Sequence, residues 1–322
     1  MKHRKSITLI IITLSALLLS FASVRAQVNY MSFHFIKVHQ EKVHNDVLEG
    51  KAGNPWQYRI LAEYMLEPVI TLFRNININR PQPSAFIFFR FLQNTFIFIA
   101  AAYFYKKLGL STYTALLGIT ILAWMISQSF YDSDLSFNTY FDVLFYLLAG
   151  IIILYEKYLW LLLLMVIAAF NRETCGLIIL LLPAYALFSQ PTHKKNKQVI
   201  LTTFGMGILY TGIFLWLRVF FGEQQFLTAH GNYPGKGILY FNIFNLRSWE
   251  QIWSTAGIIP FLALFSYRKW PKHLKVFFWV IVPVWGIIHF LASVVAETRL
   301  FLVPLSLIFI PCVLFGLNHN QD

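Results

Sequence analysis

Residues 85–107 have the sequence AFIFFRFLQNTFIFIAAAYFYKK, and this stretch decides the class of fold. It holds about twenty mostly apolar residues, the length that a helix needs to cross the hydrocarbon core of a bilayer. Hydrocarbon offers no hydrogen bonds to a backbone, so a helix is the structure expected for such a run. Three polar side chains interrupt the run, at Arg90, Gln93 and Asn94. We expect them to face neighbouring helices, where polar groups find partners.

Similar apolar runs recur along the 322 residues, of which 57% are apolar and only 12% charged. This composition is too apolar for a soluble globule. The short alternating segments typical of a membrane β-barrel do not occur. The sequence therefore predicts an all-α fold, a polytopic integral membrane helical bundle that forms a single membrane domain over 1–322. About ten spans are expected, over 6–24, 85–105, 113–130, 139–155, 158–170, 174–189, 199–221, 252–267, 276–295 and 300–317.

The basic residues orient these spans. Lys and Arg concentrate in short loops on the cytoplasmic side of membrane proteins. The chain has basic clusters at 2–5, 106–107, 157, 193–197 and 268–275. Placing all of them inside predicts an inner-membrane protein with both termini in the cytoplasm. The same bias accounts for much of the net charge of +12, so nucleic acid is not an expected partner.

The N-terminus has two interpretations. Lys2, Arg4 and Lys5 precede an apolar run over 7–24, and the run ends in Val24-Arg25-Ala26. This order resembles a signal peptide with a cleavage site near residue 26. The run is long for a signal peptide and further spans follow, so an uncleaved first helix is favoured.

Three regions outside the regular spans carry structural expectations. The first extracytoplasmic loop, 26–84, is long enough to be functional, and its part over 58–73 has the spacing of an amphipathic helix at the membrane interface. A second outer loop covers 222–250. The hairpin at 158–189 is short for two crossings, so it either crosses twice or re-enters the membrane at its polar break.

Twelve of the fourteen acidic residues fall on the outer side in this topology. Five belong to the long first loop, so loop length explains part of the imbalance. Asp46 is the candidate catalytic residue of that loop, because a carboxylate at the membrane surface can serve as a general base. An ordinary solvated aspartate is the alternative.

A second acidic group is the string Tyr131-Asp132-Ser133-Asp134. Asp132 and Asp134 could take part in catalysis or hold a divalent cation, although Asp is also common in turns and helix caps. Asp142 lies two turns into the next span. An acid inside a span is costly and tends to face a polar interior, so Asp142 is a candidate for binding substrate.

Two further outer junctions pair an acid with an arginine: Arg172-Glu173, and Glu297 with Arg299. Adjacent opposite charges can simply neutralise each other. If the junctions converge in space, however, Arg172 and Arg299 would join Arg59 in lining a site for an anionic lipid head group. We therefore predict that all five residues bind substrate.

Four strings at successive outer junctions resemble bacterial members of the GT-C glycosyltransferase superfamily: NPWQYRIL (54–61), YDSD (131–134), FNRETCGLIILL (170–181) and AETRLFLVPL (296–305). The resemblance implies an enzyme that takes sugar from a polyprenyl-phosphate donor outside the cytoplasm. It assigns Asp46 as the general base and Arg172 and Arg299 as contacts of the donor phosphate. Asp132 and Asp134 match the second acidic position of the family only loosely.

The function predicted from the sequence is thus transfer of a sugar from a lipid-linked donor to an acceptor on the extracytoplasmic face. Expected partners are membrane lipids and the polyprenyl-phosphate-linked sugar. The alternatives are a transporter or lipid-linked-sugar flippase, which the broken hairpin favours, and a non-catalytic membrane scaffold.

Overall fold

The computed structural model describes residues 2–131, 133–189, 196–227 and 231–318. Within these ranges the chain is mainly helical and contains no β-strand, and an isolated parallel bridge joins Asn54 and Phe226. The predicted all-α class is confirmed. One large cluster of buried apolar side chains extends from α1 to α16 and forms the core.

Among the described residues, six helical segments are long and apolar enough to cross a membrane. They are α1 (Lys2–Met31), α5 (Pro81–Lys107), α7 (Phe137–Leu154), α10 (Asn196–Phe221), α14 (Lys272–Ala292) and the final segment Thr298–Leu317. The remaining apolar helices are shorter: α6 (Thr112–Gln128), α8 (Trp160–Ala169) and α9 (Ile178–Ser189). A multi-pass helical architecture fits these lengths, and ten crossings stay a prediction.

Burial separates central helices from peripheral ones. In the final segment 78% of the most apolar window is buried, against 17% in α10. The outward face of α10 exposes large apolar side chains such as Leu201, Phe204 and Val219. Such a face suits lipid, because a helix in a bilayer gains nothing by hiding apolar side chains from hydrocarbon.

The region expected as a span over 252–267 is divided into two short helices. α12 (Leu246–Ala256) ends at Gly257, and α13 (Ile259–Phe265) begins two residues later. Gly257 has φ of 52°, in the left-handed region that glycine adopts without steric cost. The last segment is also subdivided, into a 3-10 turn (Thr298–Phe301), α15 (Leu302–Pro304), a π-helical turn (Leu305–Phe309) and α16 (Ile310–Asn318).

The segment 26–84, expected as the first outer loop, is mostly helical. It contains α2 (Phe33–Phe35), a π-helical turn (Ile36–Gln40), α3 (Glu41–Leu48), a 3-10 turn (Trp56–Tyr58) and α4 (Leu61–Asn75). The amphipathic helix expected over 58–73 corresponds to α4.

The polar side chains of α4 do more than face solvent. His44 of α3 is buried, and its Nδ1 and Nε2 lie 2.6 Å and 2.8 Å from carboxylate oxygens of Glu63 and Glu67. Because both ring nitrogens face an acceptor, the doubly protonated imidazolium satisfies both contacts. The two contacts of His44 hold α3 against α4.

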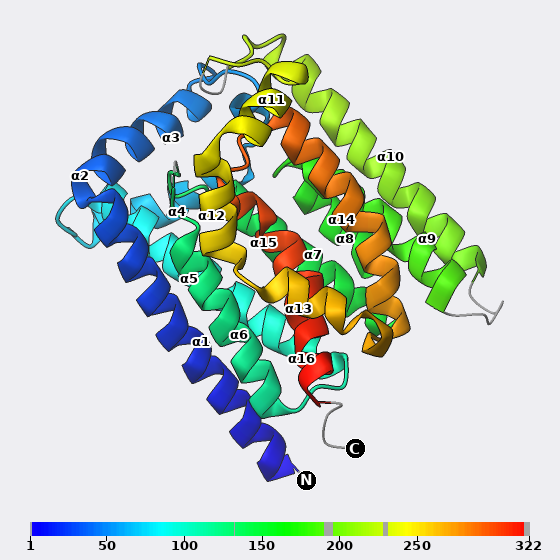
Figure 1. The fold of residues 1–322 in the computed structure, drawn as a ribbon. Coiled ribbons are helices and arrows are strands. Elements are labelled where there is room, and N and C mark those ends of the chain that lie inside the picture. Colours follow the sequence, from blue (N-terminus) through cyan, green and yellow to red (C-terminus); the bar gives the residue numbers. More distant parts are fainter. Residues whose placement is uncertain (1, 132, 190–195, 228–230, 319–322) are drawn as a thin grey trace.

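The start of α1 and the helix α16 lie at the same end of the bundle, at the bottom of Figure 1. The outer-loop helix α3 and α11 (Lys236–Phe244) lie at the opposite end. This arrangement fits the expectation that both termini share one side of the membrane. The break between α8 and α9 packs against the upper half of α10, where the Tyr210 hydroxyl donates to the Glu173 carbonyl at 2.8 Å.

Candidate functional site

The site begins with the polar break between α8 and α9. Here Arg172 adopts an extended conformation and a 3-10 turn follows over Glu173–Leu177. Two hydrogen bonds fix the break against α7: Asn171 Nδ2 donates to the Asn138 carbonyl at 2.8 Å, and Tyr146 donates to the Thr174 carbonyl at 2.6 Å. The irregular backbone is therefore held inside protein, the condition for its presence at membrane depth.

Asp142 of α7 is fully buried and accepts hydrogen bonds from the polar side chains of this break. Its carboxylate accepts from Asn171 Nδ2 and Thr174 Oγ1, both at 2.7 Å, and from Cys175 Sγ at 3.0 Å. Arg172 Nη1 lies 3.4 Å away as the counter-charge. Asp142 was predicted to bind substrate, but it is not among the described residues that line the cavity in front of Arg172. The contacts of Asp142 hold Arg172 and the break, and substrate binding by Asp142 stays a prediction.

Two further arginines, Arg59 and Arg299, reach the region around Arg172 from other segments of the chain. Arg59, from the first outer loop, donates to Glu173 Oε2 through Nε at 3.1 Å and Nη2 at 2.8 Å. Arg299, between α14 and α15, donates from Nη2 to Glu297 Oε2 at 2.6 Å. Arg172 itself donates from Nη1 to Thr139 Oγ1 at 2.9 Å.

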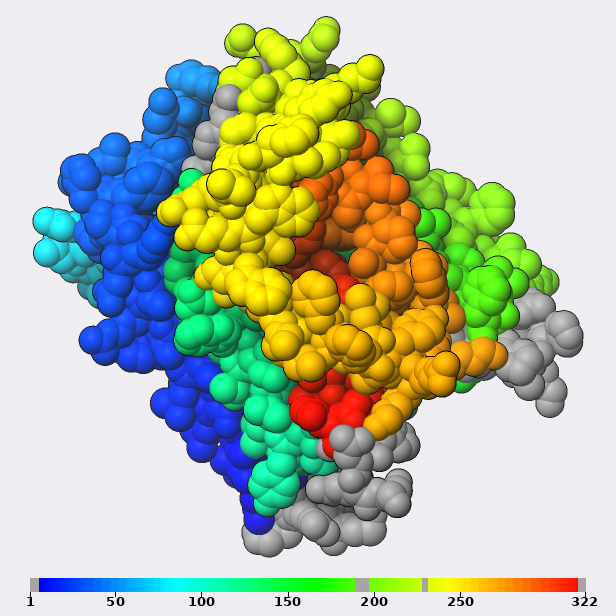
Figure 2. Space-filling view, in the orientation of Figure 1, coloured from blue at the N-terminus to red at the C-terminus, as the bar shows by residue number. Residues whose placement is uncertain are grey.

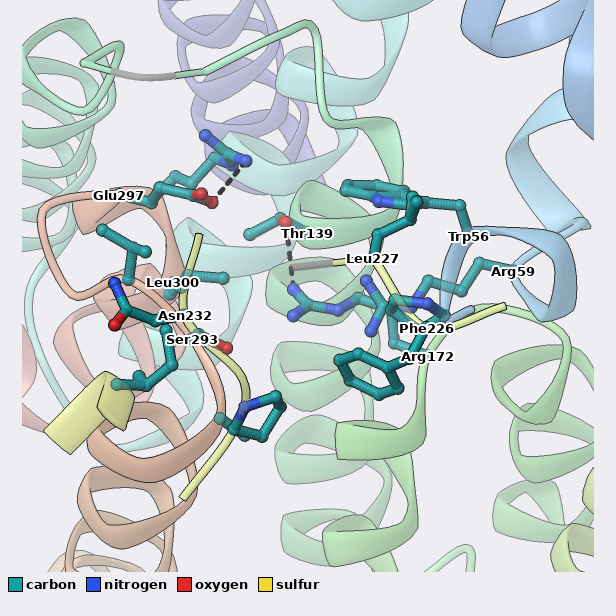
Figure 3. A pocket seen from close by; sticks show the side chains of 16 residues that line it. Trp56, Arg59, Thr139, Arg172, Phe226, Leu227, Asn232, Ser293, Glu297 and Leu300 are labelled. Atoms are coloured by element: carbon teal, nitrogen blue, oxygen red, sulfur yellow. Dashed lines mark hydrogen bonds and ion pairs between the residues drawn. The ribbon is translucent and has the colours of Figure 1, made fainter. Parts of the chain in front are cut away.

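Arg59, Arg172 and Arg299 all line one cavity of about 360 Å³, which we call the arginine cavity. Glu297 and Leu300 lie on one side of it, Trp56 and Arg59 on the other, with Arg172 between them (Figure 3). Its lining residues are Pro55, Trp56, Arg59, Thr139, Arg172, Phe226, Leu227, Asn232, Pro234, Ile238, Ala292, Ser293, Val294, Glu297, Arg299 and Leu300.

The two segments expected as outer loops meet at this cavity. Asn54 N donates to the Gln225 carbonyl at 2.9 Å, and Leu227 N donates to the Asn54 carbonyl at 3.1 Å. A Cβ on Gly53 would lie 2.7 Å from Leu227 Cγ, so glycine permits this close approach. The contact places Phe226 and Leu227 in the cavity wall.

Each lining arginine has a carboxylate partner, and these carboxylates are Glu173, Asp142 and Glu297. Glu297 alone of the three acids lines the cavity; Asp142 and Glu173 are not among its described lining residues. A carboxylate that pairs with a guanidinium fixes the plane of that guanidinium and reduces the entropy that the arginine loses when it binds a ligand. Three oriented guanidinium groups around one cavity suit a phosphate, which accepts paired N–H donors.

An apolar groove of about 190 Å³ lies next to the arginine cavity, on the other side of the segment 297–301. Trp285 Nε1 donates to the Leu300 carbonyl at 2.8 Å and holds this dividing segment in place. The groove is lined by Ile252, Thr255, Ala256, Pro260, Val282, Trp285, Gly286, Thr298, Phe301, Pro304, Leu305 and Phe309. Figure 2 shows a hollow between the yellow α12–α13 and the orange α14, with the red α15 segment at its base.

Asp46 and Asp134 are not among the described residues that line the arginine cavity. Asp46, at the end of α3, is half-buried, and its backbone carbonyl accepts from Lys51 N at 2.8 Å and Ala52 N at 3.1 Å. It is absent from the described lining of the cavity. Asp134 accepts a hydrogen bond from Ser136 Oγ just before α7. Asp132 lies outside the described residues.

The metal expectation rested on Asp132 and Asp134 together, so it stays a prediction. Across the described residues no group of three or more His, Cys, Asp or Glu side chains could hold a metal ion.

Two residues of the site escaped sequence reasoning. Thr139, at the start of an apolar helix, has no signal that separates it from other threonines, yet it receives the hydrogen bond of Arg172. Arg218 lies 3.8 Å from Glu173, and its guanidinium stacks over Tyr58 at 4.6 Å. An arginine near the outer end of an apolar run was a detectable signal for it.

This chain matches no known protein-family model, no curated protein and no solved structure.

Proposed function

We propose that this protein is a membrane-embedded glycosyltransferase-like enzyme that binds a polyprenyl-phosphate-linked sugar at its outer end. The observation that carries the proposal is the meeting of Arg59, Arg172 and Arg299, from three distant segments, on one cavity. Arginine is the side chain best suited to phosphate, because its planar fork matches two phosphate oxygens. A site that only neutralised its own acids would not need to open three guanidinium groups onto a cavity.

The adjacent apolar groove supports a lipid-linked ligand. It lies on the opposite side of the segment 297–301 and is bordered by α12, α13 and α14. A polyprenyl chain is apolar along its length, so it can pack against the apolar side chains of such a groove through van der Waals contacts. In this proposal the phosphate occupies the arginine cavity and the chain follows the groove.

Glu297 is the carboxylate that lines the cavity, and we assign it the role that the sequence alone gave to Asp46. The acceptor hydroxyl transfers its proton to Glu297, and its oxygen forms a bond to the anomeric carbon of the sugar. The bond between that carbon and the phosphate oxygen breaks, and its electron pair leaves with the lipid phosphate. Arg59, Arg172 and Arg299 stabilise the charge that grows on the departing phosphate.

Purified protein in nanodiscs with a polyprenyl-phosphate sugar, radiolabelled in the sugar, tests binding and transfer separately. Retained label measures binding, and label in an added acceptor panel measures transfer. Arg172→Gln should weaken binding of the labelled lipid by about 10- to 100-fold, since a charge-assisted hydrogen bond contributes about 1.5–3 kcal/mol. Glu297→Gln should retain binding and lose transfer.

The matched control is Arg74→Gln, which removes an exposed arginine of α4 at the same end of the bundle. It should bind and transfer like the wild type. Equal binding by Arg172→Gln and wild type would refute the phosphate site. Binding without transfer to any acceptor by the wild type, combined with movement of the labelled lipid across proteoliposomes, would replace the enzyme with a flippase.

A further inference from the structure

A groove that combines lysines, hydroxyl groups and apolar side chains lies at the opposite end of the bundle, between α1, α5 and the start of α6. It has a volume of about 950 Å³ and is lined by Ser6, Thr8, Leu9, Ile12, Tyr103, Lys106, Lys107, Ser111, Thr112 and Tyr155. α1 packs against both α5 and α6, and the ends of α1 and α6 lie side by side at the bottom of Figure 1. No feature of the proposed transfer reaction uses this groove.

The cations of the groove are held by neutral groups. Lys106 Nζ donates to Thr112 Oγ1 at 2.6 Å, and Lys107 Nζ lies 4.0 Å from the centre of the Tyr155 ring. The described lining residues include no acid, and no ion pair joins either lysine to a carboxylate within the described part of the chain. Two positive charges therefore face the groove without a counter-charge from the described residues that line it.

The position of the groove matches the surface of the bilayer. α5 has 27 residues, so at about 1.5 Å per residue it is longer than the hydrocarbon core of about 30 Å. Its last two residues, Lys106 and Lys107, are then at the level of the lipid head groups. Leu9 and Tyr103 are exposed beside them and offer an apolar surface toward the hydrocarbon.

We propose that this groove binds the head group of an anionic phospholipid from the leaflet at the N-terminal end of α1. The positive charges of the lysines balance the negative charge of the phosphodiester, and the hydroxyl groups of Ser111 and Thr112 offer hydrogen bonds. An acyl chain lies along Leu9 and Tyr103. Basic grooves between membrane helices at this depth have the chemistry that anionic head groups require. The site is separate from the arginine cavity and does not rest on the proposed transfer reaction.

Native mass spectrometry of the full-length protein with dioleoyl phosphatidylglycerol or dioleoyl phosphatidylcholine tests the proposal. Both lipids carry a phosphate and the same chains, so their difference reports net head-group charge. A lysine near an anionic lipid contributes about 1 kcal/mol, or about fivefold in affinity. The wild type should therefore retain phosphatidylglycerol at least about fivefold better than phosphatidylcholine.

The double variant Lys106→Gln/Lys107→Gln should lose this preference, whereas Lys106→Arg/Lys107→Arg should keep it. Lys197→Gln/Lys272→Gln is the matched control, because it removes two exposed lysines and should also keep the preference. A monodisperse elution profile verifies that each variant is folded. Equal retention of the two lipids by the wild type, or a full preference in the Lys106→Gln/Lys107→Gln variant, would overturn the proposal.

Discussion

Replacing Asp142 with asparagine tests the central ion pair of the candidate site. The side chains of Asp142 and Arg172 are 0% and 5% exposed, and their closest charged atoms are 3.4 Å apart. Asparagine keeps the shape and one acceptor oxygen but removes the charge, which leaves the Arg172 guanidinium buried without its counter-charge. Removing one partner of a buried pair costs about 3–5 kcal/mol, because the remaining charge stays desolvated.

The pair Arg247–Glu250 supplies a matched comparison. It is shorter, at 3.1 Å, but its side chains are 51% and 61% exposed. Exposed pairs contribute about 0–1 kcal/mol because water screens them. Glu250→Gln should therefore change stability little despite the closer contact, so burial and not distance decides the difference between the two variants.

Thermal unfolding of the purified protein in detergent, followed by fluorescence, measures both variants. At about 2 °C per kcal/mol for a chain of this size, Asp142→Asn should lower Tm by about 6–10 °C and Glu250→Gln by less than about 2 °C. In the double variant Asp142→Asn/Arg172→Gln the loss should be smaller than the sum of the single losses by about 1.5 kcal/mol. Equal Tm values for Asp142→Asn and Glu250→Gln would refute this account of the buried pair.

Three other outcomes follow from local geometry. Burial alone would lower the pKa of His44, but its two glutamate partners raise it above the ordinary value of about 6.5. The stabilisation of the folded state by the protonated His44 is therefore complete below that value and is lost as pH rises through the folded-state pKa. Thermal scans across pH should show this loss in the wild type and not in His44→Gln. Gly118→Ala places a Cβ 2.7 Å from the buried Tyr105 ring and should lower stability by about 1–3 kcal/mol. Gly207→Ala, whose Cβ meets nothing within 4 Å, should not lower stability in the same thermal assay. Gly53→Ala should separate the two outer loops and increase cleavage there in limited proteolysis, and an unchanged digestion pattern would contradict the role of that close contact.

The positions of most helices followed from the sequence, because each apolar run must bury its backbone hydrogen bonds in a helix. α5, α7, α10 and α14 begin and end within about four residues of the expected bounds. The division at Gly257 of the span expected over 252–267 is the exception. A glycine within an apolar run is compatible with either a continuous helix or a break, and tertiary packing decided for the break.

The residue types of the site were also visible in the sequence, as acids and arginines at the ends of apolar runs. Their roles were not. Arg59 meets Glu173 across 114 positions of sequence, and no local pattern encodes such a contact. Asp142, expected at the substrate, is bonded to the break that carries Arg172, and Asp46 is not among the described residues that line the arginine cavity.

The sequence by itself therefore determined a helical chain with apolar segments long enough for a membrane and with charged groups at the ends of those segments. Only the tertiary structure decided which of those charges face a cavity and which are held behind it. The physical reason is range: apolar periodicity acts within one helix, whereas the partner of a buried charge is chosen by the packing of segments far apart in the chain.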